Sequence, residues 1–253
     1  MYGDRVPATS LEAIREVVHR LFIDAEGTAL RREDEQKCRE LAGLLPHLAR
    51  LARGAHLVDA AAGKSSVGLV AAELLPLGKL TVLERDPGRV AASRAAAGRL
   101  SRHVHVDVRG ADVADADAWP DAPDAVVALH ACGGAADLVI DGAARSGARR
   151  LLLAPCCYGR TVPFAPAAER AARAMPFVAD DVLRRRIAAA LIDQERALRL
   201  EVAGFETATE ELVGPTVTPH NLLFVARRTD DPVRIARARA RLEALRAAGD
   251  VSA

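Results

Sequence analysis

Short apolar runs alternate with alanine-rich helical stretches between about residues 55 and 155, and this rhythm constrains the fold more than any other feature. The runs HLVDA, KLTVLE, HVHVDVRG, DAVVALHA and RRLLLAP have the length and composition of buried strands. The segments between them, among them SVGLVAAELL and AADLVIDGAARSG, have helical spacing. Strand–helix alternation of this kind predicts an α/β fold with a mostly parallel sheet.

Helical segments flank this region on both sides. Residues 10–52 have apolar residues at helical spacing, with Ser10 as a candidate N-cap and Gly54 as the stop. After residue 157 a loop leads into a helical region ending near Ala203, and the tail is one more helix. The segments FETATEELV and NLLFVARR read as strands whose short, helix-free connection makes them antiparallel. We expect a helical N-terminal extension over 1–52, a core over 53–228 and a C-terminal helix over 229–253.

Composition excludes several classes of protein. A content of 50% hydrophobic and 27% charged residues is that of an ordered globular chain, and four cysteines are too few for a disulfide scaffold. No run approaches the ~18 uncharged apolar residues of a membrane span, and the N-terminus lacks the pattern of a signal peptide. We therefore expect a cytoplasmic protein that does not enter a membrane. The net charge of +1 argues against a strong general attraction to nucleic acid.

The segment VDAAAGKSSVGL, at residues 58–69, falls between the first strand and its helix, where open α/β sheets bind ligands. A phosphate-binding P-loop would need glycine where Val58 stands, and a dinucleotide loop would need two further glycines around Gly63. S-adenosylmethionine (SAM) carries no phosphate and fits the segment better. Asp59 at the strand end would orient the loop or meet the ammonium group, and Ala61, Ala62 and Gly63 are small enough for adenosine to pass.

Two more acids follow the next two strands. Glu84 lies about 20 residues beyond the first loop, where an acid can bind the ribose hydroxyls. Asp112 follows the third strand, where a carboxylate can accept from the adenine amino group. Each acid alone reads as a solvated loop residue, whereas three in order after three successive strands indicate a nucleoside site.

Two further strings carry a family resemblance: LHACGGAAD at residues 129–137 and PCCY at residues 155–158. Together with VDAAAGKSSVGL and TPHNLL they resemble the SAM-dependent methyltransferases with the motifs DxxAGKG, LHACGxxTD, PCCY and TPxNLL, from about Lys37 to Arg228. That group includes the methyltransferase domain of glutathione S-transferase C-terminal-domain-containing proteins, and it is similar to a eukaryotic tRNA 2′-O-methylase family. This chain departs from the pattern at Ser65, where the family has glycine, and at Ala136, where it has threonine.

The resemblance implies a Rossmann-like class I methyltransferase fold, with a seven-stranded, mostly parallel sheet and an antiparallel C-terminal strand pair. It implies SAM as cofactor and RNA as the first candidate acceptor, with a protein or a small molecule as alternatives. The low aromatic content of 3% counts against an acceptor read by base stacking. A protein that binds SAM or S-adenosylhomocysteine (SAH) without turnover and a nicotinamide-dependent oxidoreductase stay open as other functions. The expected cofactor-binding residues are Lys37, Asp59, Ala61, Gly63, Lys64, Ser65, Glu84, Arg85, Asp112, Val113, His130 and Ala131.

The expected catalytic residues are His130, Cys156, Cys157 and Tyr158, which meet only if the fourth and fifth strands are neighbours. His130 is the candidate base because histidine titrates near neutral pH, although its ring could instead bond to the loop backbone. Tyr158 could stack on a planar substrate or hydrogen-bond across its loop.

The cysteine pair has four interpretations: packing, pocket lining, metal binding with His130 and Cys132, or a covalent nucleophile. We expect no metal, because the H-x-C and C-C spacings are unlike those of common zinc sites. His220 and Asn221 open the last strand, where turn chemistry explains them as well as function does. The arginines at 184–186 and 227–246 read as solvated helix faces, unless they border the same cleft, which would favour RNA.

Overall fold

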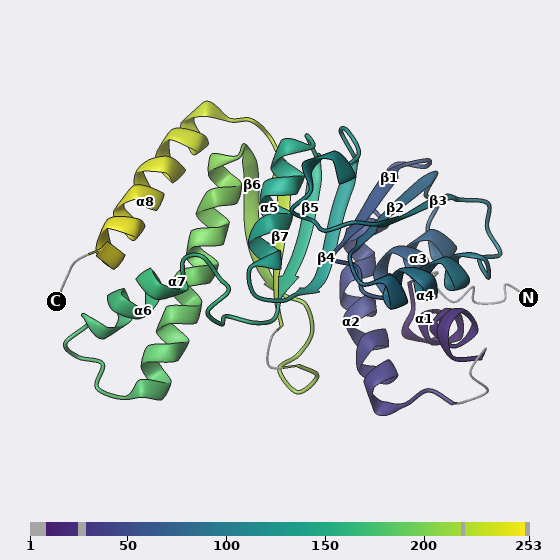
Figure 1. The fold of residues 1–253 in the computed structure, drawn as a ribbon, viewed down its shortest axis with the longest axis horizontal. Helices are drawn as coiled ribbons and strands as arrows, with labels where there is room; N and C mark the ends of the chain where they lie inside the picture. The colour runs from purple at the N-terminus through teal and green to yellow at the C-terminus, as the bar shows by residue number, and fades with distance from the viewer. Residues whose placement is uncertain (1–8, 25–28, 219–220, 251–253) are drawn as a thin grey trace, which may run out of the picture.

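A single seven-stranded sheet with helices on both faces organises the chain (Figure 1). The computed structural model describes residues 9–24, 29–218 and 221–250. The strand order is β3-β2-β1-β4-β5-β7-β6, with β1 to β5 parallel and β7 antiparallel to both β5 and β6. The mostly parallel α/β sheet with an antiparallel C-terminal pair is therefore confirmed. The strands are β1 His56–Ala60, β2 Lys79–Glu84, β3 His105–Gly110, β4 Ala125–Ala131, β5 Arg150–Pro155, β6 Phe205–Glu211 and β7 Leu222–Arg228.

The helices fall into three groups. The first covers one face of the sheet: α1 Leu11–Val18, the π-helical turn His19–Ile23, α2 Arg32–Leu48, α3 Ser66–Leu74 and α4 Pro87–Ala97. On the other face lies α5 Ala135–Arg145, beside the 3-10 turn Ala116–Ala118. Beyond them α6 Ala165–Arg173, α7 Asp181–Val202 and α8 Pro232–Asp250 pack on one another, at the left of Figure 1.

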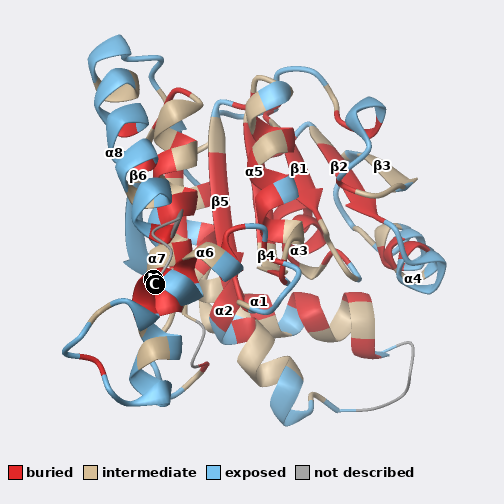
Figure 2. Cartoon of the chain, turned by 60° about the vertical axis from the view of Figure 1, so that its left-hand side comes forward, coloured by how far each residue is buried: buried red, intermediate tan, exposed pale blue. Residues whose placement is uncertain are grey.

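Burial along the strands explains the sheet. In β1 and β4 most residues are buried, as expected for central parallel strands covered on both faces (Figure 2). Alternate residues enter two cores: Leu57 packs with the N-terminal helices, whereas Val58 packs with α5. The edge strand β6 exposes Glu210 and Glu211, charges that discourage pairing with another chain.

The N-terminal helices share the first of these cores. Leu41, Leu44 and Leu45 of α2 are fully buried with Leu57 and Leu80 of the sheet. The segment before β1 therefore closes one face of the sheet, and it brings α2 within reach of the strand ends.

The helical region predicted to run up to Ala203 is divided. α6 ends at Arg173 and α7 begins at Asp181, with Pro176 in the connection, a residue that has no backbone N–H for a helical bond. Asp180 caps α7 by accepting from the backbone of Val182 and Leu183.

Among the helices in the described ranges, none is both long enough and apolar enough to cross a membrane.

Candidate functional site

Asp59 holds the loop after β1 from beneath. Its carboxylate is 1% exposed, and its Oδ2 accepts from the Ser65 hydroxyl at 2.7 Å and from the Gly68 amide at 2.8 Å. Burial raises the pKa of Asp59 to about 7, although both hydrogen bonds and the charge of Lys37 act in the opposite direction. Of the two roles expected for Asp59, these contacts supply the loop-orienting one.

The loop between β1 and α3 has an unusual backbone. Ala61, Gly63 and Ser65 all have left-handed φ values, of 52°, 60° and 55°. Such angles cost free energy for residues with a Cβ, so the surrounding contacts must hold them. Ser65, the departure from the family pattern, is fully buried with its hydroxyl on Asp59. Its side chain therefore anchors the loop.

Glu84 ties this loop to the end of β2. The carboxylate is 5% exposed, and it accepts from the Gly63 amide at 2.7 Å and from the Asp86 amide at 2.8 Å. Beyond it, Arg85 pairs with Asp112 at 3.2 Å across the ends of β2 and β3. The hydrogen bond from the Ala114 amide lowers the pKa of Asp112, burial acts in the opposite direction, and the hydrogen bond and charge of Arg85 lower the pKa further.

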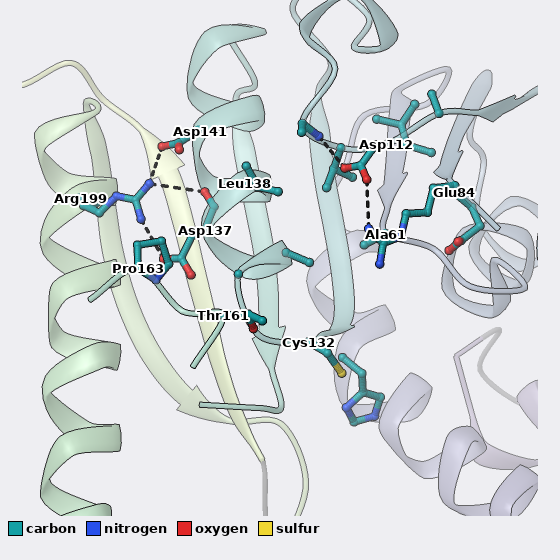
Figure 3. A pocket seen from close by; sticks show the side chains of 18 of the residues that line it. Ala61, Glu84, Asp112, Cys132, Asp137, Leu138, Asp141, Thr161, Pro163 and Arg199 are labelled. Carbon is teal, nitrogen blue, oxygen red and sulfur yellow. Dashed lines mark hydrogen bonds and ion pairs between the residues drawn. The ribbon is translucent and has the colours of Figure 1, made fainter. Parts of the chain in front are cut away.

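These elements border a pocket of about 880 Å³, called here the first pocket, at the carboxyl ends of the parallel strands. Figure 3 shows Glu84 and Asp112 on one wall, and Asp137 and Arg199 on the other. Its volume lies within the ~300–1,000 Å³ typical of cofactor sites. Six predicted cofactor residues line it: Ala61, Glu84, Arg85, Asp112, Val113 and His130. The other six do not: Lys37, Asp59, Gly63, Lys64, Ser65 and Ala131.

His130 is held by a residue that the sequence did not single out. His130 Nε2 lies 2.9 Å from Glu40 Oε2, and the backbone of His130 has φ of 61° where the β4–β5 register shifts. Glu40 is 1% exposed and also accepts from Lys37 at 3.0 Å and from Gln36 at 3.0 Å. Burial alone would raise the pKa of Glu40, but the bond from His130, the charge of Lys37 and the bond from Gln36 lower it to about 2.

The contact with Glu40 fixes the tautomer of His130. An ionised carboxylate can only accept hydrogen bonds, so Nε2 of His130 carries a hydrogen and donates a hydrogen bond to Glu40. In the neutral ring Nδ1 is then the acceptor. One signal for Glu40 was present in the sequence, because it lies four residues before Leu44 and eight before Leu48, on the apolar face of the helix.

Strands β4 and β5 are neighbours, as the catalytic prediction required. Cys132 Sγ lies 2.6 Å from Cys156 Sγ, which lies 3.4 Å from Cys157 Sγ. Cys132 belongs to the first pocket, whereas Cys156, Cys157 and Tyr158 line a second pocket of about 1,480 Å³. This second pocket is also lined by Arg160, Arg173, Arg184, Arg185 and Arg186. The arginines at 184–186 thus border a cleft with three of the four predicted catalytic residues, whereas the fourth, His130, lines the first pocket.

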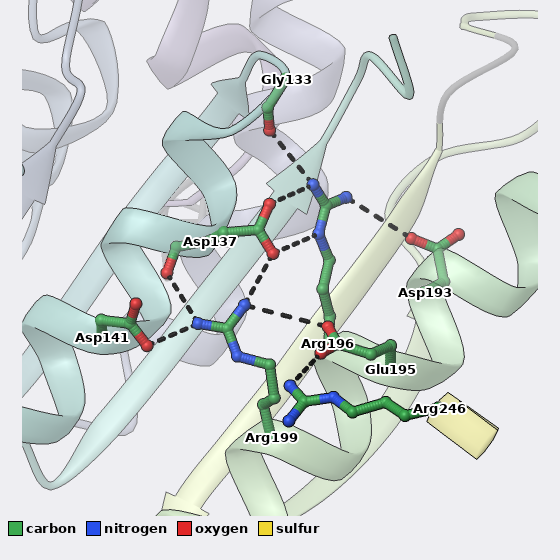
Figure 4. A network of polar contacts seen from close by, with 8 residues as sticks. All are labelled: Gly133, Asp137, Asp141, Asp193, Glu195, Arg196, Arg199 and Arg246. Carbon is green, nitrogen blue, oxygen red and sulfur yellow. Dashed lines mark hydrogen bonds and ion pairs between the residues drawn. The ribbon is translucent and has the colours of Figure 1, made fainter. Parts of the chain in front are cut away.

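A buried ion-pair network, absent from the sequence prediction, connects the two pockets (Figure 4). Arg196 is fully buried and donates to Asp137 Oδ2 at 2.9 Å and to the Gly133 carbonyl at 3.1 Å. Arg199 donates to Asp137 Oδ1 at 2.8 Å. The contacts fasten α5 and the loop after β4 to α7. One signal for Arg196 was present in the sequence, because it lies four residues after Ile192 and four before Leu200, on the apolar face of α7.

Tyr158 is engaged by the same helix. Its hydroxyl donates to Asp193 Oδ2 at 2.8 Å, and the Arg196 guanidinium lies 5.7 Å from its ring centre. Burial, then the nearby Asp193 carboxylate, raises the pKa of Tyr158, and burial raises the pKa of Asp193 to about 6. Of the two roles expected for Tyr158, the structure contains the hydrogen bond.

The turn before β7 follows backbone chemistry. The Asn221 side chain donates to the Val213 carbonyl at 2.9 Å, and its own carbonyl accepts from Leu212. Asn221 also lines the second pocket. His220 lies outside the described residues.

Comparisons with known proteins show which proteins this chain resembles in sequence and in fold. The chain is 27% identical over 232 residues to a glutathione S-transferase C-terminal domain-containing protein homolog of Drosophila pseudoobscura pseudoobscura. The match covers 80% of this chain, and the chain spans 38% of the length of that relative.

Two solved structures share the fold. Magnesium protoporphyrin IX methyltransferase (ChlM) of Synechocystis PCC 6803, with SAH bound, superposes with a TM-score of 0.51 at 16% identity, covering 87% of this chain and 100% of that one. The fibrillarin pre-rRNA processing protein of Methanococcus jannaschii also superposes with a TM-score of 0.51, at 13% identity, covering 76% of this chain and 75% of that one. The sheet is thus the Rossmann-like sheet of class I methyltransferases.

A sequence profile described as "Methyltransferase domain" matches residues 35–161, which include α2 from its first turn and all of β1 to β5. The match spans half of the 253-residue chain, and the chain belongs to this methyltransferase-domain family.

Proposed function

We propose that this chain is a SAM-dependent methyltransferase that holds SAM in the first pocket. One observation carries the choice of cofactor: the amides that a phosphate would need are already bonded to carboxylates. The Gly63 amide donates to Glu84, and the Gly68 amide, in the first turn of α3, donates to Asp59. A pyrophosphate at this loop would meet two acids instead of bare amides. A sulfonium nucleoside carries no phosphate and meets no such repulsion.

The lining residues fit the parts of SAM. Glu84 would hold the ribose hydroxyls and Asp112 the adenine amino group, while Ala61 and Val113 supply the small apolar contacts beside them. Asp59 and Ser65 would act through the loop that they anchor. When bound, SAM supplies a methyl group already activated on its sulfonium. The SAH bound by the Synechocystis enzyme, which shares this fold, supports SAM as the cofactor.

The protein must then align the acceptor and take its proton. We assign the proton-accepting role to His130, which lines the first pocket and whose Nε2–H is held by Glu40. This contact leaves Nδ1 as the ring nitrogen for the acceptor. Glu40 is then a positioning residue: it orients the ring of the proposed base, as a carboxylate does for the catalytic histidine in other enzymes.

The second pocket is the proposed acceptor site, and RNA is the proposed acceptor. Five arginines line this pocket, and its volume exceeds the ~1,000 Å³ of ordinary small-molecule sites. Within the described ranges, Arg160, Arg185 and Arg186 have no carboxylate at ion-pair distance. Guanidinium groups bind phosphates in bidentate fashion, so the pocket suits a phosphate backbone. The Arg196 guanidinium already lies over the ring of Tyr158, which favours backbone contacts over base stacking.

A ligand panel tests the cofactor. We expect SAM and SAH to raise the melting temperature, and NAD and ATP to leave it unchanged. At about 100 times Kd the true ligand adds about 2.7 kcal/mol to the free energy of unfolding. Stabilisation by NAD or ATP without SAM would refute the proposal. Binding of SAM without methyl transfer to any extract would instead indicate a SAM-binding protein without turnover.

Transfer of labelled methyl groups tests the acceptor. We expect label in total RNA, and not in a protein extract or a small-molecule fraction. The double variant Arg185→Gln, Arg186→Gln should raise KM for RNA and weaken its salt dependence. Its matched control is Arg239→Gln, Arg241→Gln on the exposed side of α8, which removes the same charge. Equal effects of the two variants, or label only in the other fractions, would exclude RNA bound in this pocket.

A further inference from the structure

Three of the four cysteines gather at the ends of β4 and β5. The Sγ atoms of Cys132, Cys156 and Cys157 all lie within 4.8 Å of one another, with Cys156 in the middle at 2.6 Å and 3.4 Å. The strand register explains why these cysteines lie together. Ala131 pairs with Pro155, and the residue that follows the end of each strand is a cysteine. The sequence placed these cysteines together only if the two strands were neighbours, and the expectation of no metal rested on their spacing along the chain, which the adjacency of β4 and β5 makes uninformative.

The cluster lies where the two pockets meet. Cys132 lines the first pocket and is seen at its lower edge in Figure 3, while Cys156 and Cys157 line the second. Cys132 and Cys157 are exposed, and Cys156 is 9% exposed. An ion from solvent could therefore reach all three sulfur atoms. The fourth cysteine, Cys38, is fully buried in the core beneath the sheet.

Polar contacts to α7 fix both segments that carry the thiols. The Gly133 carbonyl, directly after Cys132, accepts from Arg196, which Asp137 holds in place. Tyr158, directly after Cys157, donates to Asp193 one turn earlier on the same helix. The residues that bind a metal must themselves be held in place by surrounding contacts. Helix α7 makes such contacts with both segments that carry the thiols.

We propose that Cys132, Cys156 and Cys157 bind one Zn²⁺ ion as thiolates, with a fourth position open toward the second pocket. Thiolates prefer Zn²⁺ among the common divalent cations of cells, and three protein ligands with one exchangeable position characterise reactive rather than structural zinc sites. On binding, three S–H bonds are replaced by three Zn–S bonds, three protons pass to solvent, and no electron is transferred. The site is independent of the proposed methyl transfer, since it needs only the thiol geometry.

Metal analysis of the full chain tests the site. The protein is reduced, incubated with zinc, freed of excess ion by gel filtration and analysed for metal. We expect one zinc per chain. Cys132→Ala, Cys156→Ala and Cys157→Ala should each lose it, and Cys38→Ala, the matched control, should keep it. Substitution with Co²⁺ should give thiolate-to-cobalt charge-transfer absorption that disappears in the same three variants.

A measurement on the unmodified chain covers the case in which a variant fails to fold. Zinc should protect Cys132, Cys156 and Cys157 from alkylation, as mapped by peptide mass spectrometry. The proposal is overturned if the loaded chain holds no stoichiometric zinc, or if the three thiols alkylate equally with and without zinc. It is also overturned if the zinc survives all three substitutions, or if the reduced protein binds none while the oxidised protein contains a Cys132–Cys156 disulfide.

Discussion

Replacing Asp59 by asparagine isolates the cost of a buried charge beneath the first loop. Both hydrogen bonds to Asp59 end on the same oxygen, Oδ2, with Ser65 at 2.7 Å and Gly68 at 2.8 Å. An asparagine can place its carbonyl oxygen there and accept both bonds. Asp59→Asn therefore removes the charge while it keeps the geometry, and the difference in stability reports the charge.

The magnitude follows from the pKa of Asp59, which burial raises from 3.8 to about 7. Each unit of pKa difference corresponds to about 1.4 kcal/mol, so ionising Asp59 costs the folded state about 4 kcal/mol in all. Because the folded pKa is the higher one, the native state binds the extra proton, and stability is lost as pH rises from about 3.8 to about 7. Roughly 3 kcal/mol of this loss falls between about pH 5 and about pH 8.

Urea denaturation at the two pH values measures the effect. Trp119 is the single tryptophan, is 8% exposed and donates to the Val113 carbonyl, so its emission reports unfolding. We expect Asp59→Asn to be more stable than the parent at pH 8, and this advantage should be roughly 3 kcal/mol smaller at pH 5. For a chain of this size that corresponds to about 6–12 °C in Tm.

The control for this experiment is Asp121→Asn, which removes the same charge from an exposed loop position and should show no such pH dependence. If the gap between Asp59→Asn and the parent protein is the same at both pH values, the buried charge carries no such cost and the reasoning fails. The larger truncation Asp59→Ala removes the acceptor for both bonds, and we expect it to abolish SAM binding.

Three other substitutions test other contacts. Glu40→Gln keeps the shape of the side chain but removes its charge in the middle of α2. It should cost about 1–3 kcal/mol of stability and lower kcat more than it raises KM for SAM, and an unchanged kcat would contradict the positioning role. Arg196→Met leaves Asp137 buried without one partner and should cost about 3–5 kcal/mol in urea denaturation, whereas parent-like stability would contradict the network. Gly142→Ala places a methyl group against the Trp119 ring and should cost about 1–3 kcal/mol with a shifted native emission, and an unshifted emission would contradict the packing.

The sheet was predictable because its signals are local. Each parallel strand is a short apolar run, and the short connection before β7 predicts an antiparallel pair; the seven-stranded arrangement was expected from the family resemblance, and the strand order came from the structure. The acids after β1, β2 and β3 were found for the same reason, since each lies at a strand end. The structure places these acids differently. Glu84 and Asp112 line the first pocket, whereas Asp59 is buried under the loop between β1 and α3.

What the sequence did not reveal depends on contacts between distant segments. Glu40 meets His130 across 90 positions, and Arg196 meets Asp137 across 59. A helical arginine among other arginines reads as solvated, yet Arg196 is fully buried. The cysteine cluster differs, because the sequence expected it on the condition that β4 and β5 are neighbours, and only the distances between the sulfur atoms came from the fold.

The two pockets are lined by different parts of the chain, and only the first lies mostly within the range that matches the family. Apart from Pro163, Glu195, Arg199 and Arg246, the residues that line the first pocket fall within the matched range 35–161. The second pocket is built mostly from later residues, on α6 and α7. Under the proposed function, family members that match over this range are expected to share the cofactor pocket and to differ in acceptor through the helices that follow. In this chain Arg196 and Asp193 connect the two parts, since Arg196 bonds to the loop after β4 and Asp193 to Tyr158. A change of acceptor within the family should therefore map to α6 and α7 and leave the contacts of Asp59 and Glu84 in place.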